Sequence, residues 1–84
     1  MIMVDELRRY RSGSWCHLTT DGDIEELHVF AQRIGLKREW FQNVRVPHYD
    51  LRPSLRRKAL AAGARFVSAR EQARARVAQR SAID

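Results

Sequence analysis

The chain has a single cysteine, Cys16, and no apolar run that approaches the length of a membrane span. One cysteine excludes an intramolecular disulfide, and its place in a strand-like segment predicts a buried thiol in a reducing compartment. A membrane span needs roughly 20 apolar residues, far more than any run here offers. The acidic residues that follow Met1–Val4 do not match the charge pattern of a signal peptide. We therefore expect a soluble cytoplasmic protein with no membrane contact.

The sequence also lacks the short motifs that identify common enzyme classes. It contains no His-Glu-x-x-His motif, no Gly-x-Ser-x-Gly motif and no glycine-rich phosphate loop. Neither an internal repeat nor a low-complexity linker divides the chain. Its 84 residues predict one domain near the small end of the independently folding range. The core of such a domain is modest, and a homodimer is one natural way to enlarge it.

Acidic residues are scarce in the C-terminal third. Residues 51–84 carry nine Arg or Lys and two acids, whereas residues 1–50 carry seven Arg or Lys and eight acids. The net charge is +6, and 14 of the 16 cations are arginine, whose planar fork of donors suits phosphate and carboxylate. This asymmetry indicates a polyanion or an acidic protein as partner. A solvated helix face that keeps the protein soluble is the alternative.

The pattern of apolar residues alternates short strands with helices. Strands are expected at residues 1–5, 15–20, 48–51 and 65–67, helices at 23–34, 53–62 and 69–79, and a short helical turn at 37–42. Residues 7–14 are expected to form a loop, because they are polar and end in Ser-Gly-Ser.

Capping signals support the helices. Asp23 and Ser68 each precede a glutamate by three residues, which is the capping-box pattern. Ser54 is the expected cap of the middle helix, and Gly35 and Gly63 mark helix ends. The element order predicts an α/β or α+β domain with a small, partly parallel sheet of three to four strands and two to three helices. Right-handed crossovers place both middle helices on one face.

Several segments resemble one family of small phage and bacterial proteins. They are Trp15-Cys16-His17-Leu18, Glu25-Glu26-Leu27-His28, the Ile34–Gln42 segment with its Trp-Phe-Gln, His48-Tyr49-Asp50-Leu51, and Ser54 followed by basic residues, Ala59 and Ala62-Gly63-Ala64. Together they resemble the family catalogued as domain of unknown function 4031, over about residues 1–68. The resemblance implies a compact fold and a phage or bacterial origin, and it implies no activity.

The same resemblance sets the expected domain boundaries. Members usually open with a strand that ends in paired aspartates, where this chain has Asp5-Glu6. The arginine-rich segment Arg70–Arg80 lies outside the resemblance. We therefore expect a compact domain over residues 1–68, followed by a basic helix and tail over residues 69–84.

Histidines and aspartates occur inside the apolar, strand-like segments, where an unpaired polar group costs several kcal/mol. His48 and Asp50 lie two residues apart and so share one face of a strand. His17 lies on another predicted strand, and Asp5 at the end of a third. These residue types perform general acid–base catalysis or bind metals. They are the candidate catalytic residues of a small hydrolase or nuclease; the alternative is a satisfied polar core. We predict no metal ligand set and no cofactor.

The favoured hypothesis is a domain that binds a phosphate ligand or nucleic acid. A helix that begins near Ser54 presents free N–H groups suited to phosphate, and aromatic side chains stack on bases. The candidate ligand-binding residues are Trp40, Tyr49, Ser54, Arg56, Arg57 and Lys58. The candidate nucleic-acid contacts along the last helix are Arg70, Arg74, Arg76 and Arg80. Trp40 and its neighbour Phe41 are alternatively core residues. A third hypothesis is an adaptor or inhibitor that binds a host protein.

Overall fold

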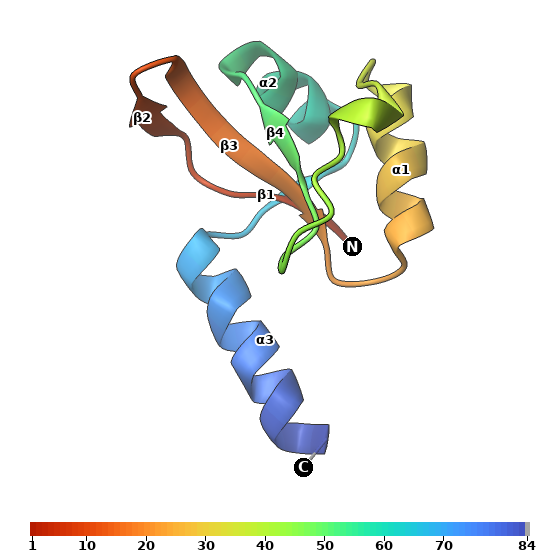
Figure 1. The fold of residues 1–84 in the computed structure, drawn as a ribbon, viewed down its shortest axis with the longest axis vertical. Helices are drawn as coiled ribbons and strands as arrows, with labels where there is room; N and C mark the ends of the chain where they lie inside the picture. Colours follow the sequence, from red (N-terminus) through yellow and green to blue (C-terminus); the bar gives the residue numbers. More distant parts are fainter. Residues whose placement is uncertain (84) are drawn as a thin grey trace.

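Five short strands and three helices make up the fold, and a computed structural model describes it for residues 1–83, with side chains through residue 80. The order is β1 (Ile2–Val4), β2 (Arg8–Tyr10), β3 (Gly13–Thr20), α1 (Ile24–Arg33), the 3₁₀ turn η1 (Arg38–Trp40), β4 (Tyr49–Leu51), α2 (Pro53–Ala61), β5 (Arg65–Phe66) and α3 (Ala69–Ile83). The expected class is confirmed as α+β in one domain (Figure 1). Residue 84, the end of the predicted basic tail, lies outside the described residues.

Strand β3 is the longest strand and pairs with three others. It runs antiparallel to β1, β2 and β4, and β1 in turn pairs in parallel with β5. The sheet is therefore partly parallel, as predicted, but it has five strands rather than three or four. The additional strand is β2, which lies in the segment predicted to be a loop. All three β2 residues are exposed and polar or amphipathic, so the segment carries no alternation of apolar residues.

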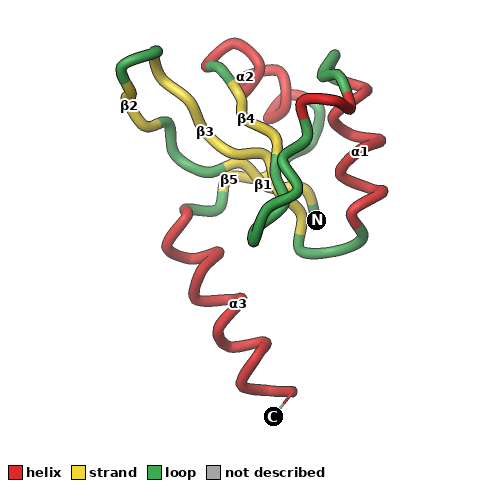
Figure 2. Tube along the Cα trace, in the orientation of Figure 1, coloured by secondary structure: helices red, strands yellow, loops and turns green. Residues whose placement is uncertain are grey.

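One face of the sheet is the hydrophobic core. Every second residue of β3 points there, and Cys16 and Leu18 are at most 1% exposed. The strand register sets Val4 and Tyr49 opposite Leu18, and Leu51 opposite Cys16. Helices α1 and α2 cover this face, as the crossover argument predicted (Figure 2). The buried residues that they contribute are Leu27, Phe30, Ala31 and Ala59, with Ile34 directly after α1.

The intervening residues of β3 point to the opposite side of the sheet, which we call the open face. Trp15, His17 and Thr19 lie there because side chains alternate along a strand. The register sets Asp50 opposite His17 and Arg8 opposite Trp15, so these two side chains share the open face. The loop 43–47 and the first turns of α3 lie at the Thr19 end of this face.

Local signals define the helix ends. The Asp23 carboxylate accepts the Glu25 N–H at 3.1 Å, which confirms the predicted cap of α1. Gly35 follows α1 at a φ of +97°, a left-handed conformation that favours glycine. The Ser54 prediction is wrong: Pro53 takes the first helical position, Arg52 is the N-cap without a side-chain cap bond, and Ser54 is exposed within the first turn.

Helix α3 is anchored at its start and then runs away from the sheet (Figure 1). The Ser68 hydroxyl accepts the Glu71 N–H at 3.1 Å, and the Glu6 carboxylate accepts the Ala69 N–H at 2.9 Å. Both bonds satisfy backbone N–H groups of the first helical turn that have no partner within the helix. The negative charge of Glu6 is also stabilising there, because it lies at the positive end of the helix dipole. The Thr19 hydroxyl donates a hydrogen bond of 2.9 Å to the side-chain oxygen of buried Gln72, which attaches α3 to the open face.

No helix among residues 1–83 combines the length and the apolar character that a bilayer crossing requires.

The buried thiol of Cys16 gives the first prediction. Burial, and secondly the Asp5 carboxylate, raise the pKa of this thiol to about 12, so almost no thiolate exists at pH 8. We expect a thiol-specific reagent to modify Cys16 at pH 8 no faster than the protein unfolds. A Val29→Cys variant is the matched control, because position 29 is 51% exposed and its thiol should react at once. Prompt modification of folded wild-type protein would contradict the assignment.

Candidate active site: a histidine–aspartate cluster on the open face

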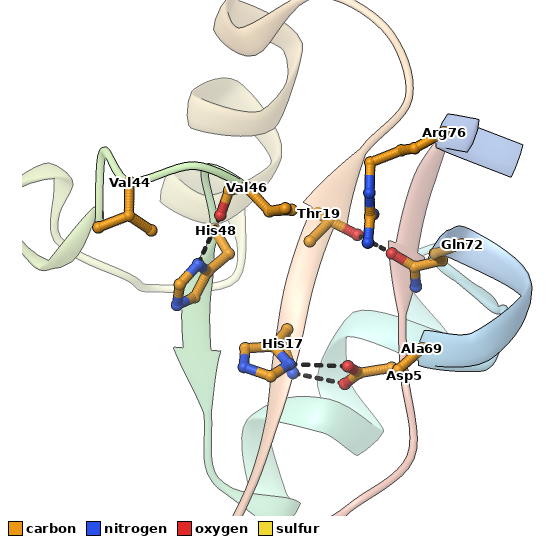
Figure 3. Close-up of a pocket in the computed structure, with 9 residues that line it drawn as sticks. All are labelled: Asp5, His17, Thr19, Val44, Val46, His48, Ala69, Gln72 and Arg76. Carbon is orange, nitrogen blue, oxygen red and sulfur yellow. Dashed lines mark hydrogen bonds and ion pairs between the residues drawn. The ribbon is translucent and has the colours of Figure 1, made fainter. Parts of the chain in front are cut away.

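All four candidate catalytic residues meet on the open face. His17 comes from β3, Asp50 from β4, His48 from the residue before β4, and Asp5 from the residue after β1. The rings of His17 and His48 are in edge contact, with centroids 4.8 Å apart. Figure 3 shows these two rings between the strands, with His17 turned toward Asp5. The structure therefore brings the four candidate residues together, and we call them the His–Asp cluster.

Asp5 holds His17 through both of its carboxylate oxygens. One oxygen lies 2.7 Å from His17 Nδ1, and the other accepts the His17 backbone N–H at 2.6 Å. Burial favours the neutral Asp5 carboxyl, but these hydrogen bonds outweigh it and hold the Asp5 pKa below its ordinary value. The same bond raises the pKa of His17, against the effect of partial burial. Nδ1 is thus occupied, and the other ring nitrogen, Nε2, remains for a ligand or substrate.

The backbone fixes His48 in a similar way. Its Nδ1 lies 2.8 Å from the carbonyl oxygen of Val46, and a carbonyl oxygen only accepts, so Nδ1 carries the proton. A pair of backbone bonds between Gln42 and His48 closes the loop 43–47 and brings the Val46 carbonyl to this position. The other ring nitrogen, Nε2, lies 3.4 Å from an Asp50 oxygen.

Asp50 is oriented from its other side. The Gln42 side-chain amide donates to the second Asp50 oxygen at 2.6 Å, which leaves the first oxygen facing His48. His17, His48 and Asp50 can each offer one ligand atom, and these three atoms lie within 4.8 Å of one another. Two histidines and one carboxylate are a set of ligand types that could hold a divalent transition metal ion.

Pockets adjoin the cluster on both sides. A pocket of about 260 Å³ is lined by Asp5, His17 and His48 together with Gln72 and Arg76 of α3. On the hairpin side, a pocket of about 320 Å³ contains His17 and Asp50 beside residues from the β2–β3 hairpin, namely Tyr10, Ser12 and Trp15. The cluster is therefore accessible to a ligand and is not sealed in a polar core, the alternative that the sequence left open.

The other candidate ligand residues fall in different places. Tyr49 is 1% exposed, and its hydroxyl lies 2.7 Å from His28 Nδ1, so it cannot stack on a base. It precedes Asp50 on β4, and because side chains alternate along a strand it lies on the core face. Trp40 is 49% exposed and lies on η1, where it lines a pocket of about 610 Å³ that also contains Asp50 and Gln42. His28 is buried, as expected for a packed residue.

The basic residues at the start of α2 divide in a similar way. Arg56 is half-buried and donates to the Asp5 backbone carbonyl oxygen at 3.0 Å. It therefore helps to hold the backbone at Asp5, one residue of the cluster. Arg57 and Lys58 are exposed on α2, which covers the core face of the sheet. Their position separates them from the open face, and no anion-binding role at the cluster follows from the structure.

The α3 arginines are all exposed, but they differ in what they line. Arg76 reaches the pocket that contains His17 and His48. Arg76 and Arg80 line a further pocket with Arg45, which gathers three cations at one place. Arg70 and Arg74 lie on the same helix outside these two pockets. The role of all four in nucleic-acid binding remains a prediction.

Sequence reasoning missed several residues of the site. Trp15 shares the open face with His17, and the two-residue spacing was a signal that could have identified it. Arg52 shares that face with Asp50 by the same rule, and its guanidinium lies 4.1 Å from the Trp15 ring centre. The Val46 carbonyl and Gln72 gave no such signal in the sequence. The closed loop 43–47 brings the first to the cluster, and the packing of α3 on the sheet brings the second.

The bond between Asp5 and His17 gives the second prediction. Asp5→Asn removes the charge from a group that accepts two hydrogen bonds, and such charged bonds contribute roughly 1.5–3 kcal/mol each. We expect the free energy of unfolding, measured with urea, to fall by about 1.5–3 kcal/mol. The control is Asp23→Asn, which keeps a good helix cap and should change it by less than about 0.5 kcal/mol. Equal stability of both variants would show that the pair contributes nothing.

Comparison with known proteins identifies the family but no activity. Neither the search of curated proteins nor the search of solved structures found a match. One family model, described as "Protein of unknown function (DUF4031)", matches residues 2–80. The match extends past residue 68, where the resemblance was expected to end, and so takes in most of α3. With this match over almost its whole length, the chain belongs to the DUF4031 family.

Proposed function

We propose that this protein is a divalent-metal-dependent phosphoesterase whose metal ion is held by His17, His48 and Asp50. One observation carries the proposal: the three ligand atoms lie within 4.8 Å of one another, and each ligand is oriented from behind by a hydrogen bond. The partners are Asp5, the Val46 carbonyl and the Gln42 amide. Metal-binding histidines regularly donate their second ring N–H to a carboxylate or a backbone carbonyl. Both histidines here have such a partner.

The spacing within the cluster suits a metal of this kind. Zinc binds nitrogen and carboxylate oxygen at roughly 2.0–2.2 Å, so neighbouring ligand atoms of a tetrahedral site are about 3.3 Å apart. His48 Nε2 and the Asp50 oxygen lie 3.4 Å apart. Binding then requires the ligand nitrogen of His17 to approach these two atoms, because the three ligand atoms lie up to 4.8 Å apart. Three protein ligands leave a fourth position for water, as in catalytic rather than structural zinc sites.

The charges around the cluster support a phosphate ester as substrate. Arg76 lines the pocket of His17 and His48, and the charge of Arg8 acts on His17. Among the side chains described through residue 80, Arg38 is the one arginine within ion-pair distance of a carboxylate. The arginines near the site are therefore available to bind an anionic substrate, whereas a neutral ester or peptide has no negative charge to pair with them.

The chemistry at such a site is hydrolysis by an activated water. A divalent ion held by His17, His48 and Asp50 would supply a hydroxide nucleophile from water at neutral pH. The hydroxide oxygen forms the new P–O bond, and the electron pair of the breaking P–O bond leaves with the alcohol oxygen. The proton lost from the water ends on that alcohol. Arg76 lines the pocket of His17 and His48, and its charge would stabilise the negative charge that increases on the phosphate oxygens.

Two other functions were expected from the sequence. Phosphate or nucleic-acid binding without turnover uses the same cations, and the absence of turnover would distinguish it. An adaptor role for α3 has no specific observation in its favour. A cytoplasmic location and a phage or bacterial origin stay predictions.

Zinc titration gives the third prediction. We expect one Zn²⁺ per chain by isothermal titration calorimetry, with loss of binding in His48→Ala and Asp50→Asn. Gln42→Ala removes a bond behind Asp50 and should weaken binding about 10- to 100-fold. Gln32→Ala, an exposed amide on α1, is the matched control. In proton NMR the ring signals of His17 and His48 should shift on zinc addition, and those of buried His28 should not. Unchanged spectra for all three histidines would rule out the site.

Turnover gives the fourth prediction. We expect the metal-loaded protein to hydrolyse bis(p-nitrophenyl) phosphate, and excess chelator to abolish the reaction. His48→Ala and Asp50→Asn should lower the rate at least about 100-fold while circular dichroism stays unchanged. Asp23→Asn serves as the control for loss of a carboxylate. Tight zinc binding without hydrolysis of any phosphate diester would exclude the phosphoesterase and leave a metal-binding protein.

A further inference from the structure

The open face offers more than the His–Asp cluster. The side chains of β3 that share this face recur every second residue, so Trp15, His17 and Thr19 follow one another at roughly 6.7 Å intervals. Trp15 lies toward the β2–β3 hairpin, and Thr19 lies against α3. The cluster is thus the middle of a continuous surface that runs from the hairpin to α3.

The hairpin end of this surface is aromatic and basic. Tyr10 is 51% exposed and lines one pocket with Trp15, His17 and Asp50. Arg52 lies over the Trp15 ring at 4.1 Å and donates to the Ser12 carbonyl oxygen at 2.8 Å. This contact fixes a flat pair of π surfaces beside the catalytic residues. Nucleic-acid bases stack on aromatic rings and on guanidinium planes alike.

Cations stand at both ends. Arg8 lies opposite Trp15 in the register, on the open face, and its charge reaches His17. Arg76 lines the pocket at the other end, next to Thr19 and Gln72. The intervening acids each have a partner within the cluster: Asp5 is bonded to His17, and Asp50 faces His48 and Gln42. The surface therefore has a cation before the cluster and a cation after it.

We infer that a single-stranded nucleic acid lies across the open face, with one base stacked at Tyr10 and Trp15 and backbone phosphates at Arg8 and Arg76. This inference rests on the proposed function, because it identifies the substrate of the same site. A phosphate that follows the stacked base lies at the His–Asp cluster, where hydrolysis occurs. An unpaired base is required, since the bases of a duplex are stacked on each other and cannot reach Tyr10 or Trp15.

The β2–β3 hairpin provides a matched pair of variants. Arg8 and Arg9 are neighbours on β2, both are exposed, and they pair with Trp15 and Ser14 respectively. Side chains alternate along a strand, so Arg8 lies on the open face and Arg9 on the other. Arg8→Gln and Arg9→Gln change the net charge equally and differ in the face that they affect. Tyr10→Ala and Tyr10→Phe separate loss of the ring from loss of the hydroxyl.

The experiment is fluorescence anisotropy with a labelled oligonucleotide of about ten nucleotides, as DNA and as RNA, in chelator so that no cleavage occurs. We expect binding that strengthens as salt falls. Tyr10→Ala should weaken it at least about fivefold, whereas Tyr10→Phe should bind like wild type. Arg8→Gln should weaken it and reduce the salt slope by about 0.7, clearly more than Arg9→Gln. A duplex of the same sequence and a mononucleotide should both bind more weakly.

Three results would overturn the inference: no binding at about 50 mM salt, equal affinity for the duplex, or equal effects of Arg8→Gln and Arg9→Gln. Zinc titration of the same preparation keeps the two proposals apart. Oligonucleotide binding by a protein that does not bind zinc contradicts the phosphoesterase and supports only the binding of single-stranded nucleic acid across the open face. Zinc binding by a protein that does not bind the oligonucleotide contradicts the binding of single-stranded nucleic acid across the open face and leaves the metal site in place.

Discussion

The alternation of side chains along β3 is the constraint on which the rest of the structure depends. Its eight consecutive residues alternate between the hydrophobic core on one side and the open face, with His17 of the His–Asp cluster, on the other. Cys16 and Leu18 are sealed against α1 and α2, whereas His17 between them faces the open side. A shift of register by one residue would bury His17 and expose the apolar residues, at a cost of several kcal/mol. The hydrophobic core therefore also fixes where the side chains of the His–Asp cluster point.

In a small domain it is an advantage that one face of the sheet forms the core and the other carries the His–Asp cluster. The chain is too short for a large interior, and the core face already requires both middle helices. The functional groups then lie on the sheet's second face, where the hairpin, the loop 43–47 and α3 surround them without covering them. Each group is held by a neighbouring element: His17 by Asp5, His48 by the Val46 carbonyl, and Asp50 by Gln42. Rigid positioning comes from pairwise hydrogen bonds between elements rather than from deep burial.

Much of this arrangement was accessible from the sequence. Caps at Asp23 and Ser68, glycine-terminated helices and the two-residue spacing of His48 and Asp50 act within a few residues, and each predicted the correct local structure. The same spacing should have excluded Tyr49 as a base-stacking residue, because it alternates with Asp50 and shares the core face with Leu51. Strand β2 was missed because an exposed strand of Arg8–Tyr10 needs no apolar alternation. The Val46 carbonyl, the docking of Gln72 and the position of Arg76 depend on contacts between distant segments, which local patterns do not report.

The bond between His48 and the Val46 carbonyl has a consequence for how this loop can vary. The acceptor is a backbone atom, so the side chains of residues 43–47 are free to change without affecting the protonation of the His48 ring. The number of residues between Gln42 and His48 is not free, because their paired backbone bonds close the loop and one inserted residue would displace the carbonyl. Relatives that keep this bond should therefore keep the length of the loop far more strictly than its composition, and the pocket lining can vary through Val44 and Val46 while the histidine stays in place.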